Sequence, residues 1–572
     1  MQMMSEASLG VVAYFSMEVG LEPGIPTYSG GLGILAGDTL RSAADLGVPM
    51  VAITLLHRKG YFRQGLDNQG NQIERPDIWN PEDILQPLEV KVTLTIEGRP
   101  VRVQAWLYRL QGLSGHTVPV YFLDTALPEN HPFDQTLTHH LYGGDAYYRL
   151  CQEAVLGIGG IALLAALGLQ NNVIHHMNEG HSALLTLGLL ERQIQAKADR
   201  TLTPAEVENV RQQCVFTTHT PVPAGHDQFS WDLVKQVLGL EWTALLEATD
   251  CCLLGNLNMT YLALRFARYI NGVAMRHGEI STGMFPDYPI DAITNGVHAP
   301  TWTSPAFANL FDRHIPEWRQ DNFYLRYAIG ISLQEIQEAH AHAKRELLEV
   351  VERRSSVRLS ENTLTIGFAR RATTYKRQYL LFSDLERLRD LASRVGPLQV
   401  IYGGKAHPRD EGGKDMIRRV FQAAKVLGDA VNVVYLENYD MALGKLICAG
   451  VDLWLNTPLR PQEASGTSGM KAALNGVPSL SILDGWWIEG HVENVTGWSI
   501  GSDAEPSRDQ VGDAASLYDK LERIIIPMYY GDPNAYASIR RFAIALNGSF
   551  FNTQRMVSQY LTNAYLPKTE EI

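Results

Sequence analysis

The chain has 572 residues, of which 45% are hydrophobic and 19% charged, as in globular rather than disordered or fibrous proteins. This length corresponds to about two large α/β domains. The formal net charge is -13 and no long basic run occurs, which argues against nucleic acid as the main partner.

The cysteines and the apolar segments indicate in which cellular compartment the protein is found. Five cysteines are scattered without the spacing of a disulfide framework, so we expect them to be reduced and the protein to be cytoplasmic. Residues 1–7, M-Q-M-M-S-E-A, lack the basic and apolar regions of a secretory signal. The longest apolar run, residues 154–169, is short for a membrane span and predicts a buried helix. We therefore expect no membrane partner.

The N-terminal residues predict a parallel α/β sheet. Residues 11–18 are typical of a buried strand, S-G-G-L-G follows at 29–33, a helix is predicted over 34–46, and the next strand is predicted at 50–56. This βαβ order indicates a parallel sheet. The glycines match the dinucleotide fingerprint weakly, because about a dozen residues separate them from the strand. A glycine loop at a helix start that serves a different anion is the better interpretation.

The next segments extend this first domain. Alternation over residues 88–122 predicts antiparallel strands, and residues 141–168 read as mostly helical. Residues 262–280 predict a further helix. The Pro- and Trp-rich residues 299–318 predict a crossover between two domains.

Histidines stand at the ends of two predicted strands. His176, Glu179 and His181 invite a metal site, but their spacing is not that of H-E-x-x-H and no second cluster completes it. A hydrogen-bonded cluster at a strand end is favoured, and no metal is expected. His219 ends a short strand, where α/β proteins gather ligand-contacting groups, although a lone histidine there is more often structural.

A second α/β unit is predicted after the charged helix over 332–353. Its predicted strands alternate with helices and lie at residues 363–370, 398–403, 431–436, 451–456 and 479–483. The first of these strands ends in Arg370 and Arg371, and Lys376 follows closely. Cations at the end of a buried strand are costly unless an anion joins them, which favours an anion site over a solvated helix start. Two last helices, 517–526 and 535–552, carry no recognisable chemistry.

The turn at 463–476, E-A-S-G-T-S-G-M-K-A-A-L-N-G, follows one of these strands and opens a helix. A Gly/Ser/Thr loop at a helix start presents free N–H groups and suits an anion such as phosphate. Lys471 could be a counter-ion for that phosphate, or an amine that forms a Schiff base with an aldehyde cofactor. An ordinary βα turn with a solvent-facing lysine is the third interpretation, and the residues alone leave all three open.

A series of motifs in this order resembles the α-glucan phosphorylases, the family of glycogen, starch and maltodextrin phosphorylase. The most specific is E-A-S-G-T-x-x-M-K at 463–471 followed by L-N-G, which is similar to the family's pyridoxal phosphate lysine motif. The supporting motifs are S-G-G-L-G at 29–33, T-H-T at 218–220, I-N-G-V-A at 270–274, T-N-G-V at 294–297, Y-K-R-Q at 375–378, G-G-K-A at 403–406 and L-E-N-Y at 436–439.

The resemblance implies an α/β fold of two Rossmann-like domains that face each other across a cleft, the B-type glycosyltransferase fold. We divide the chain into residues 1–310 and 311–572. The implied reaction is the reversible, configuration-retaining phosphorolysis of a terminal α-1,4-linked glucose of maltodextrin or glycogen to glucose 1-phosphate. Pyridoxal 5′-phosphate is the implied cofactor, with its phosphate as acid/base partner of inorganic phosphate. The expected partners are maltooligosaccharide or glycogen and inorganic phosphate, and a homo-oligomer stays possible.

The resemblance also implies roles for single residues. Catalytic roles are implied for Lys471, His219, Arg371 and Lys376. Lys471 would hold the cofactor as a Schiff base, with further cofactor contacts from Thr467, Ser468, Arg370, Trp302, Tyr439 and Gly30. Substrate contacts are implied for Glu463, Ala464, Ser465, Gly466, Asn295, Gly31, Leu32, Asp145 and Tyr375. Two phosphates held close together repel, and cations with aligned N–H groups make that arrangement tolerable.

Some positions depart from the family's larger members. Ser29 and Arg370 stand where those members carry an amide and a lysine, which puts direct contacts by Ser29 in doubt. The N-terminal regulatory segment of those members is expected to be absent, so we expect no control by phosphorylation or AMP.

Two alternative functions compete with the phosphorylase. A nucleotide-sugar-dependent glucan synthase shares the fold, but no nucleotide-binding acidic or aromatic pattern follows Lys471. A non-catalytic glucan-binding protein is the other alternative, but Arg371, Lys376, Lys471 and Glu463 are all present.

Overall fold

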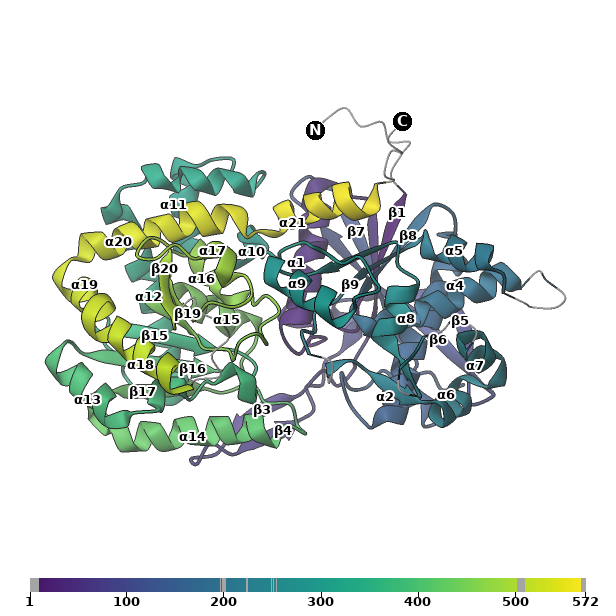
Figure 1. Ribbon diagram of the computed structural model, residues 1–572, viewed down its shortest axis with the longest axis horizontal. Coiled ribbons are helices and arrows are strands. Elements are labelled where there is room, and N and C mark those ends of the chain that lie inside the picture. Colours follow the sequence, from purple (N-terminus) through teal and green to yellow (C-terminus); the bar gives the residue numbers. More distant parts are fainter. Residues whose placement is uncertain are drawn as a thin grey trace.

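The computed structural model describes residues 10–195, 197, 202–222, 225–247, 249, 251–253, 255–501 and 510–566. The chain forms two α/β halves, each built around its own parallel sheet and covered by helices (Figure 1). The expected α/β fold is therefore confirmed.

The first half contains a nine-stranded sheet of order β14-β13-β9-β8-β1-β2-β7-β6-β5. Neighbours from β14 to β7 are parallel, and β5 and β6 add the antiparallel strands that alternation predicts. The strands are β1 (Val11–Phe15), β2 (Met50–Leu55), β5 (Gln86–Ile96), β6 (Arg99–Gln111), β7 (Thr117–Asp124), β8 (Val173–Asn178), β9 (Cys214–Thr217), β13 (Tyr269–Gly272) and β14 (Asp291–Ala292).

Helices pack around this sheet. They are α1 (Gly31–Leu46), α2 (Ala146–Ala154), α3 (Gly160–Ala166), α4 (Leu185–Ile194), α5 (Pro204–Arg211), α6 (Trp231–Leu238), α7 (Leu240–Glu247), α8 (Met259–Arg265) and α9 (Met275–Met284). A π-helical segment, Val155–Gly159, joins α2 to α3. Among the described residues, the resulting run Ala146–Ala166 alone has the length and apolarity of a membrane span, and 72% of its apolar window is buried inside the protein. The predicted buried helix is confirmed.

The predicted helix over 262–280 is wrong. In the structure α8 ends at Arg265, the buried strand β13 follows, and α9 begins at Met275. β13 pairs with β9 and β14 in the sheet, so tertiary pairing decides its conformation. Periodicity alone does not separate a short apolar strand from a buried helical turn.

The second half contains a six-stranded parallel sheet of order β17-β16-β15-β18-β19-β20. Its strands are β15 (Leu364–Ala369), β16 (Leu398–Gly403), β17 (Asn432–Leu436), β18 (Leu453–Asn456), β19 (Ser479–Ile482) and β20 (Gly497–Ile500). The five strands predicted in this half are confirmed, and β20 was not predicted.

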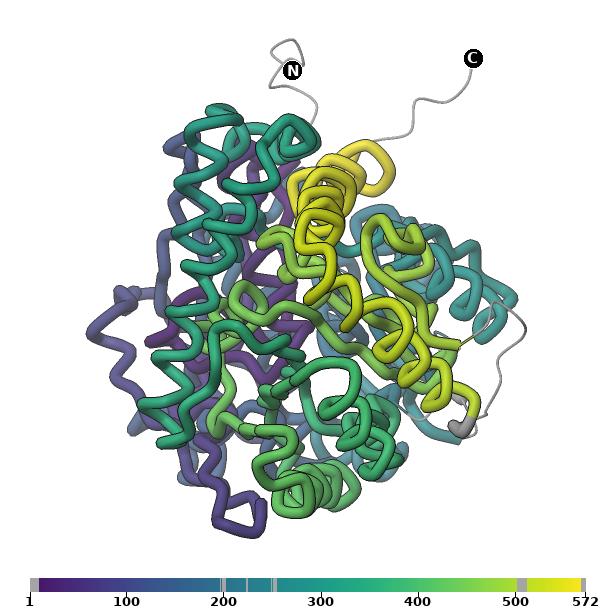
Figure 2. The backbone as a smooth tube through the Cα atoms, turned by 90° about the vertical axis from the view of Figure 1, so that its left-hand side faces the viewer, coloured from purple at the N-terminus to yellow at the C-terminus, as the bar shows by residue number. Residues whose placement is uncertain are grey.

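The helices of the second half include the predicted charged helix, here α12 (Leu333–Ser355). The others are α13 (Leu385–Arg394), α14 (Glu411–Leu427), α15 (Met441–Gly450), α16 (Ser468–Leu474), α17 (Trp487–Gly490), α18 (Gln510–Lys520), α19 (Ile526–Gly531) and α20 (Pro533–Phe542). Helices α19 and α20, in yellow, lie on the outer face of this half (Figure 2). The expected crossover over 299–318 is itself partly helical, as α10 (Ala299–Trp302) and α11 (Pro305–His314).

A hairpin of the first half reaches under the second half (Figure 1). It consists of β3 (Arg63–Leu66) and β4 (Gln72–Arg75). Gln64 exchanges hydrogen bonds with Asn438, N to Oδ1 at 3.1 Å and Oε1 to N at 2.9 Å. The Gln64 amide also donates to the carbonyl of Gly404 at 3.0 Å, so backbone and side chains fix the distance between the halves here.

The C-terminal residues return to the first half. Helix α21 (Thr553–Tyr560) lies beside α1 (Figure 1), and the Thr553 hydroxyl is 2.6 Å from that of Ser42 on α1. Tyr565 bonds His176 of β8 at 2.6 Å between OH and Nδ1. These contacts group residues 553–565 with the first sheet, and the division at 1–310 and 311–572 stays a prediction.

A buried carboxylate joins the helices of the second half to its sheet. Asp452 accepts from Lys344 of α12 at 2.6 Å and from Arg540 of α20 at 2.8 Å. It also lies 2.9 Å from Nε2 of His340 and accepts from the backbone of Thr365 on β15 at 2.8 Å. Burial alone would raise the pKa of Asp452, but these cationic neighbours outweigh it and hold the pKa well below its ordinary range.

We predict that Asp452→Asn lowers the free energy of unfolding by about 3–5 kcal/mol, because it leaves buried cations without their counter-charge. Because the pKa of Asp452 is lowered in the folded protein, Asp452 contributes to the free energy of unfolding of the wild type at pH values above 3.8, its ordinary pKa. This contribution is lost as the pH falls below 3.8. Denaturant unfolding at pH 7 and at pH 2 measures both effects. The exposed Asp390→Asn is the control and should leave the midpoint unchanged; an equal loss in both variants would contradict the role of Asp452.

Candidate functional site

A cavity of about 860 Å³ lies between the two halves, at the carboxyl ends of both sheets. Ligands of open α/β sheets bind at this edge. All residues to which the sequence assigned a role line this one cavity, namely Gly30, Gly31, Leu32, Asp145, His219, Asn295, Trp302, Arg370, Arg371, Tyr375, Lys376, Tyr439, Glu463, Ala464, Ser465, Gly466, Thr467, Ser468 and Lys471. The structure thus brings together residues that are up to 441 positions apart, from Gly30 to Lys471.

The glycine loop that precedes α1 is held by Glu18. This carboxylate accepts from Ser29 N at 2.5 Å, from the Ser29 hydroxyl at 3.1 Å and from the Tyr142 hydroxyl at 2.8 Å. Burial raises the pKa of Glu18, and these hydrogen bonds oppose the rise. A Cβ added at Gly30 or Gly31 would meet open space, so the loop backbone is accessible from the cavity. Ser29 therefore shapes the loop through Glu18.

His219 is fixed by the strand-end cluster that the sequence indicated. Its Nε2 lies 2.6 Å from Asn178 Oδ1, and its backbone N donates to Glu179 at 2.8 Å. Glu179 also accepts from Gly180 N and from the Thr220 hydroxyl, both at 2.9 Å. Burial lowers the pKa of His219 to about 3, so the imidazole is neutral at pH 7. The hydrogen-bonded interpretation of this cluster is confirmed.

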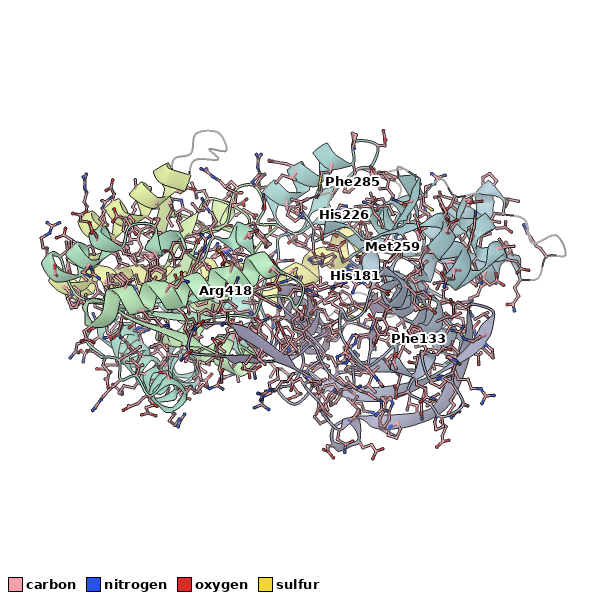
Figure 3. All side chains as sticks on the ribbon, turned by 90° about the horizontal axis from the view of Figure 1, so that it is seen from below. Phe133, His181, His226, Met259, Phe285 and Arg418 are labelled. Atoms are coloured by element: carbon pink, nitrogen blue, oxygen red, sulfur yellow. The ribbon has the colours of Figure 1, made fainter. Side chains whose placement is uncertain are left out.

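An ion-paired group forms the cavity wall beside this cluster. Arg149 donates to Asp227 at 2.9 Å and to Glu153 at 3.0 Å. His181, which lies near the junction of the two halves in Figure 3, is 3.4 Å from Asp227. Burial lowers the pKa of His181 to about 3, so at neutral pH Arg149 is the cation of this group.

Asn295 is positioned by the returning helix α21. Arg555 donates to the backbone carbonyls of Thr294 at 2.6 Å and Asn295 at 3.0 Å. The side-chain Oδ1 of Asn295 is buried and has no hydrogen-bond partner among the described residues. An acceptor left unpaired in a cavity wall is suited to a ligand hydroxyl.

Two buried cations of the second half share one carboxylate. Glu463 accepts from Arg370 at 2.7 Å and from Lys376 at 2.9 Å. Burial alone would raise the pKa of Glu463, but Arg370 and Lys376 outweigh it and lower the pKa to about 2. The three side chains therefore carry a net charge of +1 at neutral pH.

Asp484 lies directly behind Glu463. Its Oδ2 accepts from the backbone N of Glu463 at 2.9 Å, and its Oδ1 from Gly485 N at 3.0 Å. Burial raises the pKa of Asp484 to about 7, and the charge of Glu463 adds to the rise. A Cβ at Gly485 would lie 2.3 Å from the carbonyl of Ser465, so the turn packs tightly on this loop.

Lys471 lies in the last turn of α16, with its ammonium 3.6 Å from the centroid of the Trp302 ring. The side chain is buried, and its Nζ has no hydrogen bond or ion pair to another described residue. Burial lowers the pKa of Lys471, while Asp38 and Cys448 oppose the shift. A lysine with a lowered pKa is a better nucleophile at neutral pH.

Two other polar side chains of the second half, Thr467 and Arg371, line the cavity without a hydrogen bond to another described residue. The Thr467 hydroxyl makes no cap hydrogen bond to α16. Arg371 is exposed, and its guanidinium has no hydrogen bond or ion pair within the described chain. Tyr375 places its ring under the Lys376 ammonium at 4.6 Å. These groups leave several donors facing the cavity.

Asp145 has a structural partner as well as a place in the cavity wall. It is the N-cap of α2 and accepts from Tyr148 N at 3.0 Å. Its side chain is exposed, so a carboxylate oxygen stays available to a ligand.

Sequence reasoning missed several cavity residues. Glu18, Asp227, Lys405 and His407 all line the cavity. Glu18 follows the first strand and Lys405 follows β16, so a search of strand ends would have found both. Asp227 follows no strand end, and no local signal points to it. Within the described residues, no group of His, Cys, Asp or Glu has the arrangement of a metal site.

Comparison with protein families gives a match over residues 253–498 to the model described as carbohydrate phosphorylase. Similar proteins cover nearly the whole chain. Maltodextrin phosphorylase of Thermococcus litoralis is 39% identical, over 97% of this chain and 70% of the relative. Glycogen phosphorylase of Mycobacterium tuberculosis is 36% identical, over 98% of this chain and 71% of the relative. Glycogen phosphorylase of Aquifex aeolicus is 34% identical, over 97% of this chain and 86% of the relative.

We predict that Glu463→Gln lowers the free energy of unfolding by about 3 kcal/mol, because Arg370 and Lys376 lose their counter-charge. Inorganic phosphate should then raise the thermal midpoint of Glu463→Gln more than that of the wild type, since a bound anion replaces the charge. The lowered pKa of Glu463 means that its contribution is present above 4.5 and is lost as pH falls toward 2.

Thermal unfolding with phosphate or with sodium chloride of equal ionic strength measures this effect. Glu493→Gln is the matched control, because Glu493 has a pKa lowered to about 2 by His491 and Lys520 against burial, but does not line the cavity. Its response to phosphate should equal that of the wild type. An equal response of Glu463→Gln would contradict the assigned charge balance.

Proposed function

Since the chain belongs to the carbohydrate phosphorylase family, we propose that it catalyses the reversible, configuration-retaining phosphorolysis of terminal α-1,4-linked glucose from maltodextrin or glycogen. The products are glucose 1-phosphate and the shortened glucan. The observation that carries the proposal is the convergence of unpaired donors and cations from one half on a wall from the other half, where His219 is neutral and Asn295 has an acceptor unpaired among the described residues. The named relatives and the two-domain glycosyltransferase fold support the same reaction.

The donor set of the cavity fits pyridoxal 5′-phosphate. Lys471 supplies a buried amine with no polar partner among the described residues, and Trp302 supplies an aromatic face beside it. Tyr439 also lines this cavity, and Arg370 supplies a cation to it. Lys471 would hold the aldehyde covalently, and the remaining contacts would come from Thr467, Ser468, Arg370, Trp302, Tyr439 and Gly30. When bound, this cofactor would supply a phosphate group that exchanges a proton with inorganic phosphate.

Arg371 and Lys376 bind the inorganic phosphate in this proposal, together with the backbone of Gly31. Lys376 is buried and Arg371 is exposed, so the two cations approach the anion from different depths. The accessible backbone of the glycine loop adds N–H donors from the other half. Aligned donors and cations lower the energy of a bound phosphate dianion.

The glucose hydroxyls are bound by polar groups of both halves. Asn295 offers its unpaired Oδ1, and His219 offers a neutral imidazole. Glu463, Ala464, Ser465 and Gly466 form the facing turn, with Leu32, Asp145 and Tyr375 at its sides. The backbone carbonyl of His219 would stabilise the positive charge that develops on the sugar ring.

Glu463 is unsuited to the acid role of a glycosidase. Retaining glycosidases use one protonated carboxyl and one nucleophilic carboxylate. The pKa of Glu463 is lowered to about 2 by Arg370 and Lys376 against its burial, so it carries no proton at neutral pH. Proton donation to the leaving glycosidic oxygen is therefore assigned to the inorganic phosphate that Arg371 and Lys376 hold.

Several expectations remain proposals. They are a cytoplasmic location and a homo-oligomer. The proposed domain boundary at residue 310 belongs with them.

Incubation of maltodextrin with inorganic phosphate should release glucose 1-phosphate, and acid treatment of the protein should release pyridoxal phosphate. Coupled detection of glucose 1-phosphate and the absorbance of the acid extract measure these results. Release of nucleotide from a nucleotide sugar with glucan extension would instead favour the synthase. Glucan binding with neither product would favour the non-catalytic protein.

We predict that Lys471→Ala abolishes cofactor retention and lowers phosphorolysis at least 1,000-fold, an effect of about 4 kcal/mol or more on the barrier. Intact mass after borohydride reduction reports the cofactor independently of turnover. Lys445→Ala is the control, because Lys445 is half-buried on the neighbouring α15 but does not line the cavity. Cofactor trapped on the Lys471→Ala chain would show that another amine holds it.

A further inference from the structure

The aromatic surface under Lys471 is itself held by a buried carboxylate. Trp302 donates its Nε1–H to Asp38 Oδ2 at 2.6 Å, and its ring centroid is 3.6 Å from the Lys471 ammonium. Asp38 belongs to α1 of the first half and is 1% exposed. Lys471 belongs to α16 of the second half, so the contact from Asp38 through Trp302 to Lys471 crosses the junction of the halves.

Asp38 is fixed on its other sides as well. It accepts from the backbone N of His298 at 3.2 Å and from Arg41 at 3.4 Å. Arg41 is anchored in turn on the backbone carbonyls of Gly20 and Leu21. The carboxylate therefore has a single orientation, with Oδ2 directed at the indole.

The backbone of Trp302 is tied to the helix that carries Lys471. The Asn475 amide donates to the Trp302 carbonyl at 2.9 Å and to the Lys471 carbonyl at 3.0 Å. Its Oδ1 accepts from Ser304 N at 2.7 Å. Asn475 sets the spacing of the two backbones, and Asp38 sets the direction of the ring.

A hydrogen bond to an anion increases the electron density of the donor ring, and linked hydrogen bonds polarise one another at low dielectric. A ring with more electron density attracts a cation on its face more strongly. Lys471 has no other polar partner among the described residues, so this contact is its main local stabilisation as an ammonium.

We propose that Asp38 is a positioning residue for Lys471, which fixes and polarises the Trp302 ring and thereby sets the fraction of Lys471 present as free amine. The proposal rests on the proposed function, in which that amine takes up the cofactor. In this proposal α1 contributes to the site twice. Its N-terminus carries the glycine loop, and Asp38 lies about two turns after Gly31.

The other groups around Lys471 leave Asp38 as its nearest counter-charge. Burial raises the pKa of Cys448 on α15 to about 12, so that thiol is neutral. Burial lowers the pKa of Lys445 on the same helix, and Arg41 lowers it further. Arg370 and Tyr439 line the same cavity. The other elements packed on α16 carry no ionisable side chain: α10, β18, β19 and the π-helical residues 543–548. His298, next to α10, is bonded to Asp45 at 2.8 Å.

The test measures Lys471 directly. The full chain, freed of cofactor, is labelled with trace acetic anhydride from pH 6 to pH 11, and acetylation of the Lys471 peptide is quantified by mass spectrometry. Asp38→Asn keeps an oxygen for the Trp302 N–H but removes the charge. We expect its reactivity midpoint about one pH unit lower than in the wild type, and about tenfold faster labelling below the midpoint. Superimposed profiles would overturn the proposal.

Two further variants separate charge from position. Asp45→Asn alters the same helix and the same His298 segment without contact to Trp302, so its Lys471 profile should match the wild type. Trp302→Phe keeps an aromatic face without an N–H, should itself lower the midpoint, and should shrink the effect of Asp38→Asn. If Asp38→Asn lowers the Lys471 midpoint as much in the Trp302→Phe background as in the wild type, the ring does not transmit the effect. If Asp45→Asn lowers the midpoint as much as Asp38→Asn does, Asp38 has no specific role and the proposal is overturned.

Uptake of added pyridoxal phosphate, trapped by borohydride, is followed in parallel. At pH 7 uptake should be faster in Asp38→Asn than in the wild type. Absence of uptake by the wild type would contradict the proposed function, while the acetylation profiles would still decide the role of Asp38.

Discussion

Repulsion between like charges that gather in one cavity is the constraint on which this structure depends. Arg370, Arg371 and Lys376 all follow a single strand, β15, and two of them are buried. At an effective dielectric constant of about 20, two charges about 4 Å apart interact with about 4 kcal/mol, so this gathering needs negative charge nearby. Glu463 supplies it from the neighbouring strand connection. The turn at 463–471 therefore serves the electrostatics of the whole cavity as well as the placement of one lysine.

The first half contributes neutral groups to the cavity beside the ion pair of Arg149 and Asp227. His219 is uncharged because burial lowers its pKa to about 3, and Asn295 offers an amide oxygen. The glycine loop contributes backbone N–H groups, which attract anions without adding a cation to the repulsion. A cationic wall thus faces hydrogen-bonding groups of the first half, as a ligand that is phosphate at one end and sugar at the other requires.

Much of this could be predicted from the sequence, and the limits have physical causes. Most strands of the two sheets follow from short local patterns, and so do the cations at the end of β15, because ligand-binding groups stand at strand ends. Most other roles in the cavity came from the resemblance to the α-glucan phosphorylases. The helix predicted over 262–280 failed because β13 is decided by its partners β9 and β14, which the local sequence does not contain. Asp38 and Arg555 were missed for the same reason: each acts on cavity residues that lie far away in the sequence. Their position on amphipathic helices gives no local sign of function.

The return of the chain to its first sheet has a consequence for biosynthesis. Met556, Val557, Tyr560 and Tyr565 belong to the same apolar cluster as Val12, Tyr14 and Leu40. A ribosome releases residues 553–565 only after the entire second sheet has been made. The core around β1, the first strand of the chain, is therefore incomplete until α21 has been synthesised. The second sheet is completed late as well: its strands lie within residues 364–500, but Tyr536 and Ile539 of α20 belong to its apolar cluster. Both halves therefore complete their cores only after the C-terminal helices have been synthesised.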